Sequence, residues 1–150
     1  MTNFDELKFK QIEKAVKKGD LIAIGSLGQR IKDIREALGM TQSQLAKRAK
    51  IKQPALSRLE ENISKSSLST VIKIINALGC TFMGAIITTE NDLRKIVEQQ
   101  AEKVAGKILE RISANMAMEE QAATKSAYNF QLKELIADFV ANPGPELWED

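Results

Sequence analysis

The sequence predicts a mainly α-helical protein. Three segments, within residues 27–38, 68–78 and 93–116, carry apolar residues at spacings of three and four, the periodicity of one helix face. Gly39 and Gly79 follow the first two segments, where a left-handed residue commonly ends a helix. The run at residues 80–87 is the one candidate for a short strand. With 43% hydrophobic residues, the chain has enough apolar side chains for a packed core.

Residues 41–60 predict two short helices joined by a tight turn. Thr41 and Gln44 have the spacing of a capping box, which opens the first helix. Small residues at positions 46 and 49 allow another helix to approach closely. Pro54 falls in the first turn of the second helix, where its missing N–H costs nothing. This arrangement is a helix-turn-helix, a structure that places its second helix against DNA.

The second helix has an inward apolar pair, Leu56 and Leu59, and a polar outer face. Arg binds guanine through two hydrogen bonds, Gln binds adenine in the same way, Ser bonds either, and Ala contacts the thymine methyl group. The predicted base contacts are therefore Gln53, Ala55, Ser57 and Arg58. Any amphipathic helix pair also exposes such residues, so the prediction depends on the whole pattern.

That pattern resembles the lambda-repressor-like (Xre-type) helix-turn-helix domain over residues 27–79. The resemblance implies a five-helix DNA-binding domain in which the first helix of the pair begins against a phosphate. It implies phosphate contacts at Thr41, Gln42, Lys65 and Ser66, and Lys52 is added to them because of its charge. Lys52 replaces the Ser or Thr that often caps the recognition helix, which weakens the cap but adds a positive charge.

The flanking helices complete this domain. The first predicted helix is marked by Leu27, Ile31, Ile34 and Leu38. A polar loop is expected at residues 62–67, where Ser66 or Ser67 caps the next helix. The apolar residues of that helix are Leu68, Val71, Ile72, Ile75 and Leu78.

Charge divides the chain into parts. Residues 26–80 hold ten Lys or Arg against four Asp or Glu, whereas residues 81–150 hold seven against twelve. The overall charge of +2 therefore conceals a basic middle suited to phosphates. We predict an N-terminal helical arm at 1–25, a DNA-binding domain at 26–80 and an acidic helical extension for dimerisation or partner binding at 81–150. The acidic residues can also be read as ordinary solvated helix surface.

The extension is predicted to be a hairpin of long helices. Its first helix spans about 36 Å at 1.5 Å per residue, too long an apolar stripe for one small domain to cover alone. A final helix at residues 127–141 supplies part of the cover. The remainder is an intramolecular core, a dimer seam or a partner's surface. The residues predicted to face a copy or partner are Leu93, Val97, Val104, Ile108, Ile112 and the tail residue Trp148.

The run at 80–87 has two interpretations. As a strand, it needs a partner edge, which a second subunit can supply. Otherwise it lies against the domain as an extended segment.

Segments from end to end of the chain resemble the mobile mystery protein A family; they lie at residues 34–40, 77–80, 96–101, 116–121 and 147–148. Members are typically encoded beside a protein with a Fic domain, so the resemblance implies an antitoxin-like regulator with a Fic-domain partner encoded nearby. Ser57, Glu61 and Asn62 match the letters of a Fic-inhibitory motif, but a helix that ends at Asn62 explains the same residues.

The composition argues against an enzyme. There is no His, and Cys80 is the single Cys, so we expect no metal site, no cofactor and no internal disulfide. The mixed-charge start does not resemble a secretion signal, and no apolar run approaches the ~20 residues that cross a membrane. The protein is expected to be cytoplasmic.

These observations predict a homodimeric, sequence-specific DNA-binding repressor of an inverted repeat near its own promoter. The alternative is a partner-sequestering protein that inhibits a Fic-type enzyme without significant DNA binding.

Overall fold

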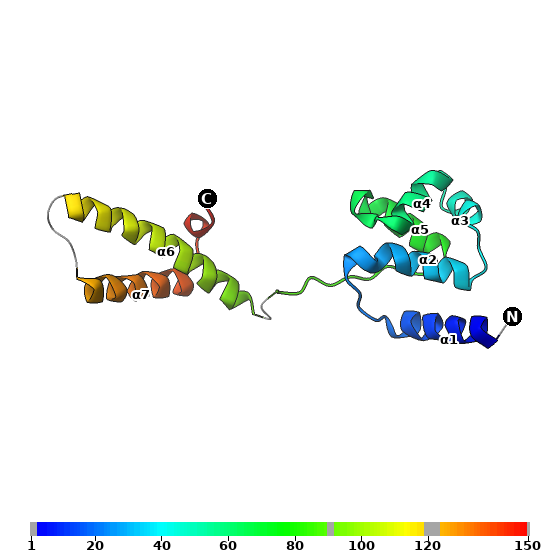
Figure 1. Cartoon of the computed structure of the whole chain (residues 1–150), viewed down its shortest axis with the longest axis horizontal. Helices are drawn as coiled ribbons and strands as arrows, with labels where there is room; N and C mark the ends of the chain where they lie inside the picture. The colour runs from blue at the N-terminus through cyan, green and yellow to red at the C-terminus, as the bar shows by residue number, and fades with distance from the viewer. Residues whose placement is uncertain (1–2, 90–91, 119–123, 150) are drawn as a thin grey trace. The chain divides into compact units, whose positions relative to one another are not determined.

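The computed structural model describes residues 3–89, 92–118 and 124–149. Within these ranges the protein is mainly helical, with seven α-helices and no β-strand (Figure 1). The chain divides into two compact units, Met1–Ala85 and Ile86–Asp150. None of the helices in these ranges is both long and apolar enough to cross a membrane. The finer division at residues 25 and 80 stays a prediction.

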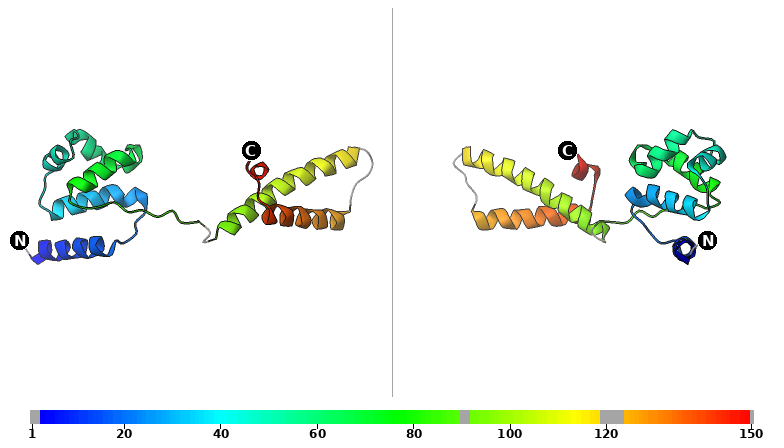
Figure 2. Two further views of the ribbon diagram at one scale, coloured as in Figure 1. Left: turned by 180° about the vertical axis from the view of Figure 1, so that it is seen from behind. Right: turned by 45° about the vertical axis from the view of Figure 1, so that its right-hand side comes forward.

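The first unit consists of α1 (Asn3–Lys18), α2 (Leu27–Ala37), α3 (Gln42–Arg48), α4 (Gln53–Glu61) and α5 (Leu68–Ala77), with 3-10 turns η1 (Ile24–Ser26) and η2 (Ile63–Lys65). The helix α2 packs against α4, and α3 packs against both α4 and α5. Figures 1 and 2 show α2 to α5 gathered into one bundle, with α1 alongside α2. The pair α3 and α4 is thus held in place by two further helices.

Left-handed residues follow three helices of this bundle, α2, α3 and α5. Gly39, with φ +69°, follows α2, and Gly79, with φ +77°, follows α5, as the sequence predicts. The Gly39 N–H donates to the Glu36 carbonyl at 2.9 Å, which satisfies a carbonyl of the last turn. Lys50, with φ +55°, holds the corresponding position after α3. The turn between α3 and α4 therefore uses a conformation that usually favours glycine.

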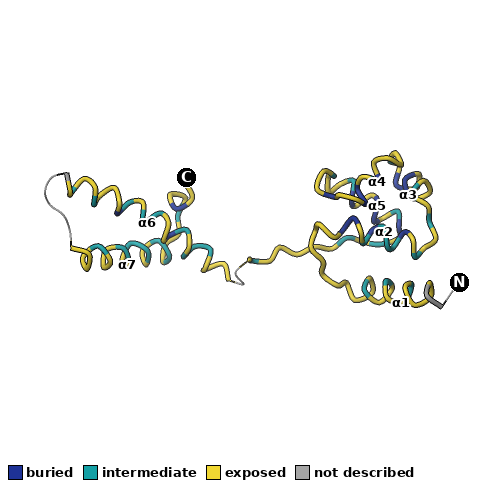
Figure 3. The backbone as a smooth tube through the Cα atoms, in the orientation of Figure 1, coloured by how far each residue is buried: buried dark blue, intermediate teal, exposed yellow. Residues whose placement is uncertain are grey.

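The core of the first unit lies between α2, α3, α4 and α5. Its buried side chains are Leu27, Ile31, Leu45, Ala46, Ala49, Leu56, Leu59, Ile63, Val71, Ile74, Ile75 and Leu78. Figure 3 shows this burial gathered inside the bundle. The backbones of α2 and α4 meet at Gly28, where an added Cβ would lie 2.5 Å from the Leu59 carbonyl oxygen. Only a glycine allows that approach.

Three of the apolar residues that mark the predicted helices lie outside the core. Leu38, Leu68 and Ile72 are exposed by 47%, 55% and 36%. The expected polar loop at 62–67 also differs, because it contains η2 and buries Ile63.

The N-terminal helix α1 ends before Gly19, whose φ is +62°. It lies against α2, and Lys8 Nζ is 3.6 Å from Glu36 Oε2. Ile12 is half-buried, whereas Leu7 is 57% exposed. The role of this arm stays open.

The second unit is a pair of helices, α6 (Leu93–Met118) and α7 (Lys125–Ala141), which pack side by side, with a 3-10 turn η3 (Pro145–Trp148) against α6 (Figures 1 and 2). Asp92 Oδ1 accepts from the Arg94 N–H at 2.9 Å at the start of α6. The Thr124 side chain caps α7, which begins two residues earlier than predicted.

The buried face of α6 lies within the predicted apolar stripe, and the residues predicted to face a copy or partner are the less buried part of it. Ala101, Ala105 and Leu109 are buried, whereas Leu93 is 70% and Ile112 44% exposed. The other predicted stripe residues, Val97, Val104 and Ile108, are half-buried. One neighbouring helix covers only a narrow strip of a long helix, and small alanines occupy that strip because they let the two backbones approach.

The C-terminal turn is anchored by Leu147, which is fully buried. Gln100 Nε2 donates to the Leu147 carbonyl at 2.8 Å and joins η3 to α6. Trp148, which the sequence analysis selected, is 51% exposed. Leu147, rather than Trp148, therefore anchors the C-terminal turn within the chain.

Of the two interpretations of residues 80–87, the described chain has the extended segment, which pairs with no strand of the same copy. Phe82 packs against the core of the first unit, whereas Met83, Ile86 and Ile87 are largely exposed. A strand needs a neighbouring edge for its backbone hydrogen bonds, and the helical units supply none.

Candidate nucleic-acid interface

The helix pair α3 and α4 is assembled as the sequence predicts. Thr41 Oγ1 accepts from the Gln44 N–H at 3.2 Å, and the Thr41 N–H donates to Gln44 Oε1 at 2.8 Å, which completes the capping box. Ala46 and Ala49 are buried where α3 meets its neighbours. Pro54 lies in the first turn of α4, and the N-cap residue Lys52 makes no side-chain capping bond.

The outer face of α4 carries the predicted base contacts. Gln53, Ala55 and Arg58 are exposed, and Ser57 is half-buried. Leu56 and Leu59 on the opposite face are buried, so the orientation of the helix is fixed by the core. Within the described residues the Arg58 guanidinium has no hydrogen-bond or ion-pair partner. Its five N–H donors are available to an external acceptor.

A chain of polar contacts runs from the core to this face. Arg35 Nε donates to Glu60 Oε1 at 2.6 Å, and the second terminal nitrogen of Arg35 donates to Glu60 Oε2 at 3.0 Å. Gln42 Nε2 donates to Glu60 Oε2 at 2.9 Å. Gln53 Nε2 then donates to Gln42 Oε1 at 2.9 Å. Two residues predicted for different roles, Gln42 and Gln53, are thereby joined.

These contacts leave defined atoms free. The side-chain amide of Gln42 donates one N–H to Glu60 and accepts the hydrogen bond from Gln53 through its oxygen Oε1. Gln53 retains its own amide oxygen and one N–H, a pair that can bind one acceptor and one donor. Its orientation is set before any ligand arrives, which lowers the entropy cost of binding.

The base of the network is a buried ion pair. Arg35 and Glu60 are 7% and 5% exposed, and Arg35 also donates to the Met40 carbonyl at 2.8 Å. Burial alone raises the pKa of Glu60, but the hydrogen bonds from Arg35 and Gln42 together with the Arg35 charge outweigh it and hold the pKa below its usual range. The hydrogen bond to Glu60 raises the pKa of Arg35. Both groups are charged at neutral pH, and each compensates the other.

Neither member of this pair is predicted from the sequence. A signal was present, because Arg35 lies four residues after Ile31 and Glu60 lies four residues after Leu56, each on the helix face of that buried residue. Two opposite charges on the inward faces of packed helices indicate a buried pair. One-dimensional spacing does not show that the two faces meet.

The predicted phosphate contacts lie at the beginnings of α3 and α4 and at the end of η2. Lys52 and Lys65 are exposed, Ser66 is half-buried, and Thr41 is exposed although its oxygen serves the capping box. Gln42 lies at the first position of α3, where it also bonds Glu60. The structure joins Gln42 and Gln53 by a hydrogen bond, and within the described residues it shows no hydrogen bond among the side chains of Lys52, Lys65 and Ser66.

The residues that match the Fic-inhibitory letters belong to the same helix. Ser57 and Glu61 lie on α4, and Asn62 Oδ1 accepts from the Ser64 N–H at 3.0 Å, which caps η2. Asn62 thus has a structural role at the helix end. Its match to the motif stays a prediction.

Comparison with known proteins agrees with this architecture. Residues 31–83 match a family model described as helix-turn-helix. Antitoxin HipB from Escherichia coli O6:H1 is 35% identical over 74 residues, which cover 49% of this chain and 77% of HipB. No solved structure gives a significant match. The chain therefore belongs to the family of antitoxin HipB, and its residues 31–83 form a helix-turn-helix domain of the lambda-repressor-like type.

Proposed function

We propose that the protein is a sequence-specific DNA-binding repressor with an antitoxin-like role. The observation that carries the proposal is the pre-oriented outer face of α4. On this face Gln53 is held by Gln42 at 2.9 Å, and Arg58 is exposed and unpaired within the described residues. An outward amide and an outward guanidinium on one helix are the groups that read adenine and guanine in the major groove.

The contacts divide into two classes. Gln53, Ala55, Ser57 and Arg58 read bases from α4. Thr41, Gln42, Lys52, Lys65 and Ser66 surround them and hold the phosphates. Phosphate contacts set the position of the helix on the duplex, whereas base contacts choose the sequence.

Charge supports this division of labour. The first unit holds fifteen Lys or Arg against eight Asp or Glu, and the second holds seven against twelve. A basic unit is attracted to the phosphate backbone at any sequence, and an acidic unit is repelled by it. We therefore assign DNA to the first unit and protein contacts to the second.

Two copies are needed for the operator that we propose, an inverted repeat near the gene's own promoter. A single α4 covers only a few base pairs, and a two-fold dimer places two such helices about 34 Å apart on one face of the duplex. We propose that the second unit joins the copies.

The antitoxin role is supported by the similarity to antitoxin HipB. The resemblance to the mobile mystery protein A family implies that the toxin-like partner is a Fic-domain protein encoded nearby. The second unit is the surface that we assign to this partner. Co-expression with the product of the adjacent gene, followed by purification through a tag on that product, tests this assignment.

The DNA-binding proposal is tested by fluorescence anisotropy with the upstream DNA and a scrambled duplex over a salt series. We expect Arg58→Ala to weaken binding to the upstream DNA by about 1–3 kcal/mol and to relax preference at one base pair. Lys52→Ala should weaken binding to both duplexes equally and reduce the salt slope by about 1. Lys73→Ala, which removes an exposed charge outside the proposed contacts, is the matched control.

An equal loss on both duplexes for Arg58→Ala would reject its base-reading role. Absence of binding to either duplex would favour the alternative, a protein that sequesters a Fic-type partner without reading DNA.

A further inference from the structure

The second unit has too little core for a stable unit of its size. Its buried apolar side chains, within the described residues, are Ala101, Ala105, Leu109 and Leu147. Two of these are alanines, which contribute little apolar area. The helix α7 has no buried residue at all, and its larger apolar side chains, with the exception of the exposed Phe130, are half-buried: Tyr128, Leu132, Leu135, Ile136, Phe139 and Val140. A two-helix unit of this kind usually needs another surface to cover it.

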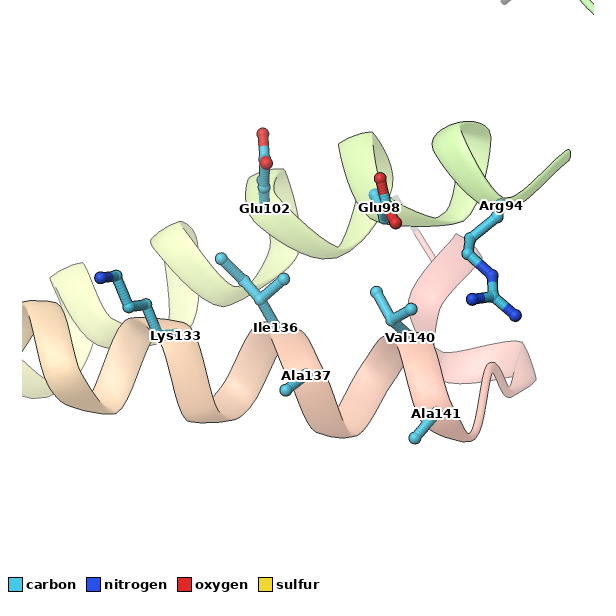
Figure 4. A pocket seen from close by; sticks show the side chains of 8 residues that line it. All are labelled: Arg94, Glu98, Glu102, Lys133, Ile136, Ala137, Val140 and Ala141. Carbon is cyan, nitrogen blue, oxygen red and sulfur yellow. The ribbon is translucent and has the colours of Figure 1, made fainter. Parts of the chain in front are cut away.

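An open groove of about 630 Å³ marks where that cover fits. Its apolar wall is one face of α7, formed by Ile136, Ala137, Val140 and Ala141 at helical spacing. Figure 4 shows Ile136 and Val140 pointing from α7 toward α6. The two alanines have small side chains, so another helix can approach the α7 backbone closely at this point.

Charged residues of both signs surround this apolar wall. Arg94, Glu98 and Glu102 come from α6 at spacings of four, and Lys133 comes from α7 (Figure 4). None of these four side chains has a hydrogen bond or ion pair within the described part of the chain. A rim with two cations and two carboxylates is complementary to itself, because a two-fold rotation can place the Lys133 of one copy against Glu98 or Glu102 of the other.

We propose that this groove between α6 and α7 is the dimer interface and that its occupant is the α7 helix of a second copy. The resulting four-helix arrangement covers the half-exposed face of α7 in both copies, and its rim charges compensate each other. The inference rests on the proposed function in one respect, since an inverted repeat requires two copies. The sequence predicts the dimer contact on the α6 stripe that includes Leu93 and Ile112, whereas this proposal places it on the α7 face at Ala137.

The test measures the oligomeric state of the full chain in the absence of DNA, by sedimentation equilibrium over a concentration series. We expect the wild-type protein to be a dimer at micromolar concentration. Ala137→Glu places an unpaired carboxylate in the apolar wall of both copies, so the dimer dissociation constant should rise at least about 100-fold. Ala127→Glu adds the same charge at another exposed alanine of α7 outside the groove, and it should leave the constant unchanged.

A second variant guards against a folding defect in the first. Lys133→Glu alters an exposed side chain on the rim and leaves three carboxylates against one cation, so we expect about a 10-fold weaker dimer, with a larger effect at low salt. Circular dichroism should show unchanged helix content for both variants. A wild-type monomer, or an unchanged dissociation constant in both Ala137→Glu and Lys133→Glu, would overturn the proposal. A wild-type monomer that binds a toxin partner through Ala137 would assign the groove to that partner.

Failure of this proposal can be separated from failure of the proposed function. Arg58→Ala should lose DNA preference and remain a dimer, whereas Ala137→Glu should dissociate and retain helical content. If DNA recognition fails, the result of the sedimentation experiment is unaffected, because that experiment contains no DNA.

Discussion

The two units of this protein differ in how completely they bury their apolar side chains. The first unit encloses large aliphatic side chains from four helices and compensates its one buried ion pair within the bundle. The second packs two long helices through a narrow strip of alanines and leaves α7 half-exposed along its length (Figure 3). The difference indicates that the core of the first unit is closed within a single copy, whereas the second unit leaves apolar surface that another molecule can cover.

The largest effect is expected where the first unit buries charge. Arg35→Ala leaves Glu60 buried without its partner, and we expect a loss of about 3–5 kcal/mol in the free energy of unfolding of the first unit. Urea denaturation followed by circular dichroism measures this loss. Arg48→Ala is the control, because Arg48 also bonds a carbonyl, that of Ala77 at 3.1 Å, but at an exposed position. A loss in Arg35→Ala no larger than in the control would contradict the assigned role of the pair.

In the second unit the most sensitive residue should be Leu147. Leu147→Ala removes a fully buried side chain and should cost about 2–5 kcal/mol, whereas the half-exposed Trp148→Ala should cost less. Thermal unfolding of the two variants at equal concentration compares them. If Trp148→Ala proved the more damaging, the tail would be anchored differently from the structure described.

Glycine substitutions test this difference in packing, since a glycine in a tight contact and one in open space should change the free energy of unfolding in opposite directions. Gly28→Ala drives a Cβ into the Leu59 carbonyl oxygen at 2.5 Å and should destabilise the first unit by about 1–3 kcal/mol. Gly106→Ala, in the middle of α6, meets nothing within 4 Å and should stabilise the second unit by about 0.5–1 kcal/mol. Paired denaturation curves give both signs, and a stabilising Gly28→Ala would show that α2 and α4 are farther apart.

A smaller effect is expected from pH. The pKa of Glu60 is lowered in the folded protein, so the ionised carboxylate contributes stability that is present above the ordinary Glu pKa of about 4.3 and is lost as the pH falls below it toward the folded value. The effect is smaller than that of Arg35→Ala because a protonated carboxyl can still accept a hydrogen bond. Melting temperatures between neutral and acidic pH should fall less steeply in Glu60→Gln. A Glu60→Gln curve parallel to that of the wild type would exclude this contribution.

Local rules were sufficient for much of the first unit. The capping box at Thr41, the proline in the first turn of α4 and the stops at Gly39 and Gly79 all depend on contacts between residues close in sequence. Local rules did not separate the two interpretations of residues 80–87. Their composition suits a strand, but strand formation depends on a distant edge that the described chain does not provide.

Most of the helices and the outward set Gln53, Ala55, Ser57 and Arg58 follow from sequence alone, because helical periodicity and capping are local. Three features required the folded structure: that Arg35 and Glu60 meet, that Gln42 holds Gln53, and that Leu147 rather than Trp148 is buried. Each of these depends on which helix faces come together and at what separation. Spacing along one helix identifies a face, but it does not identify the face that packs against it.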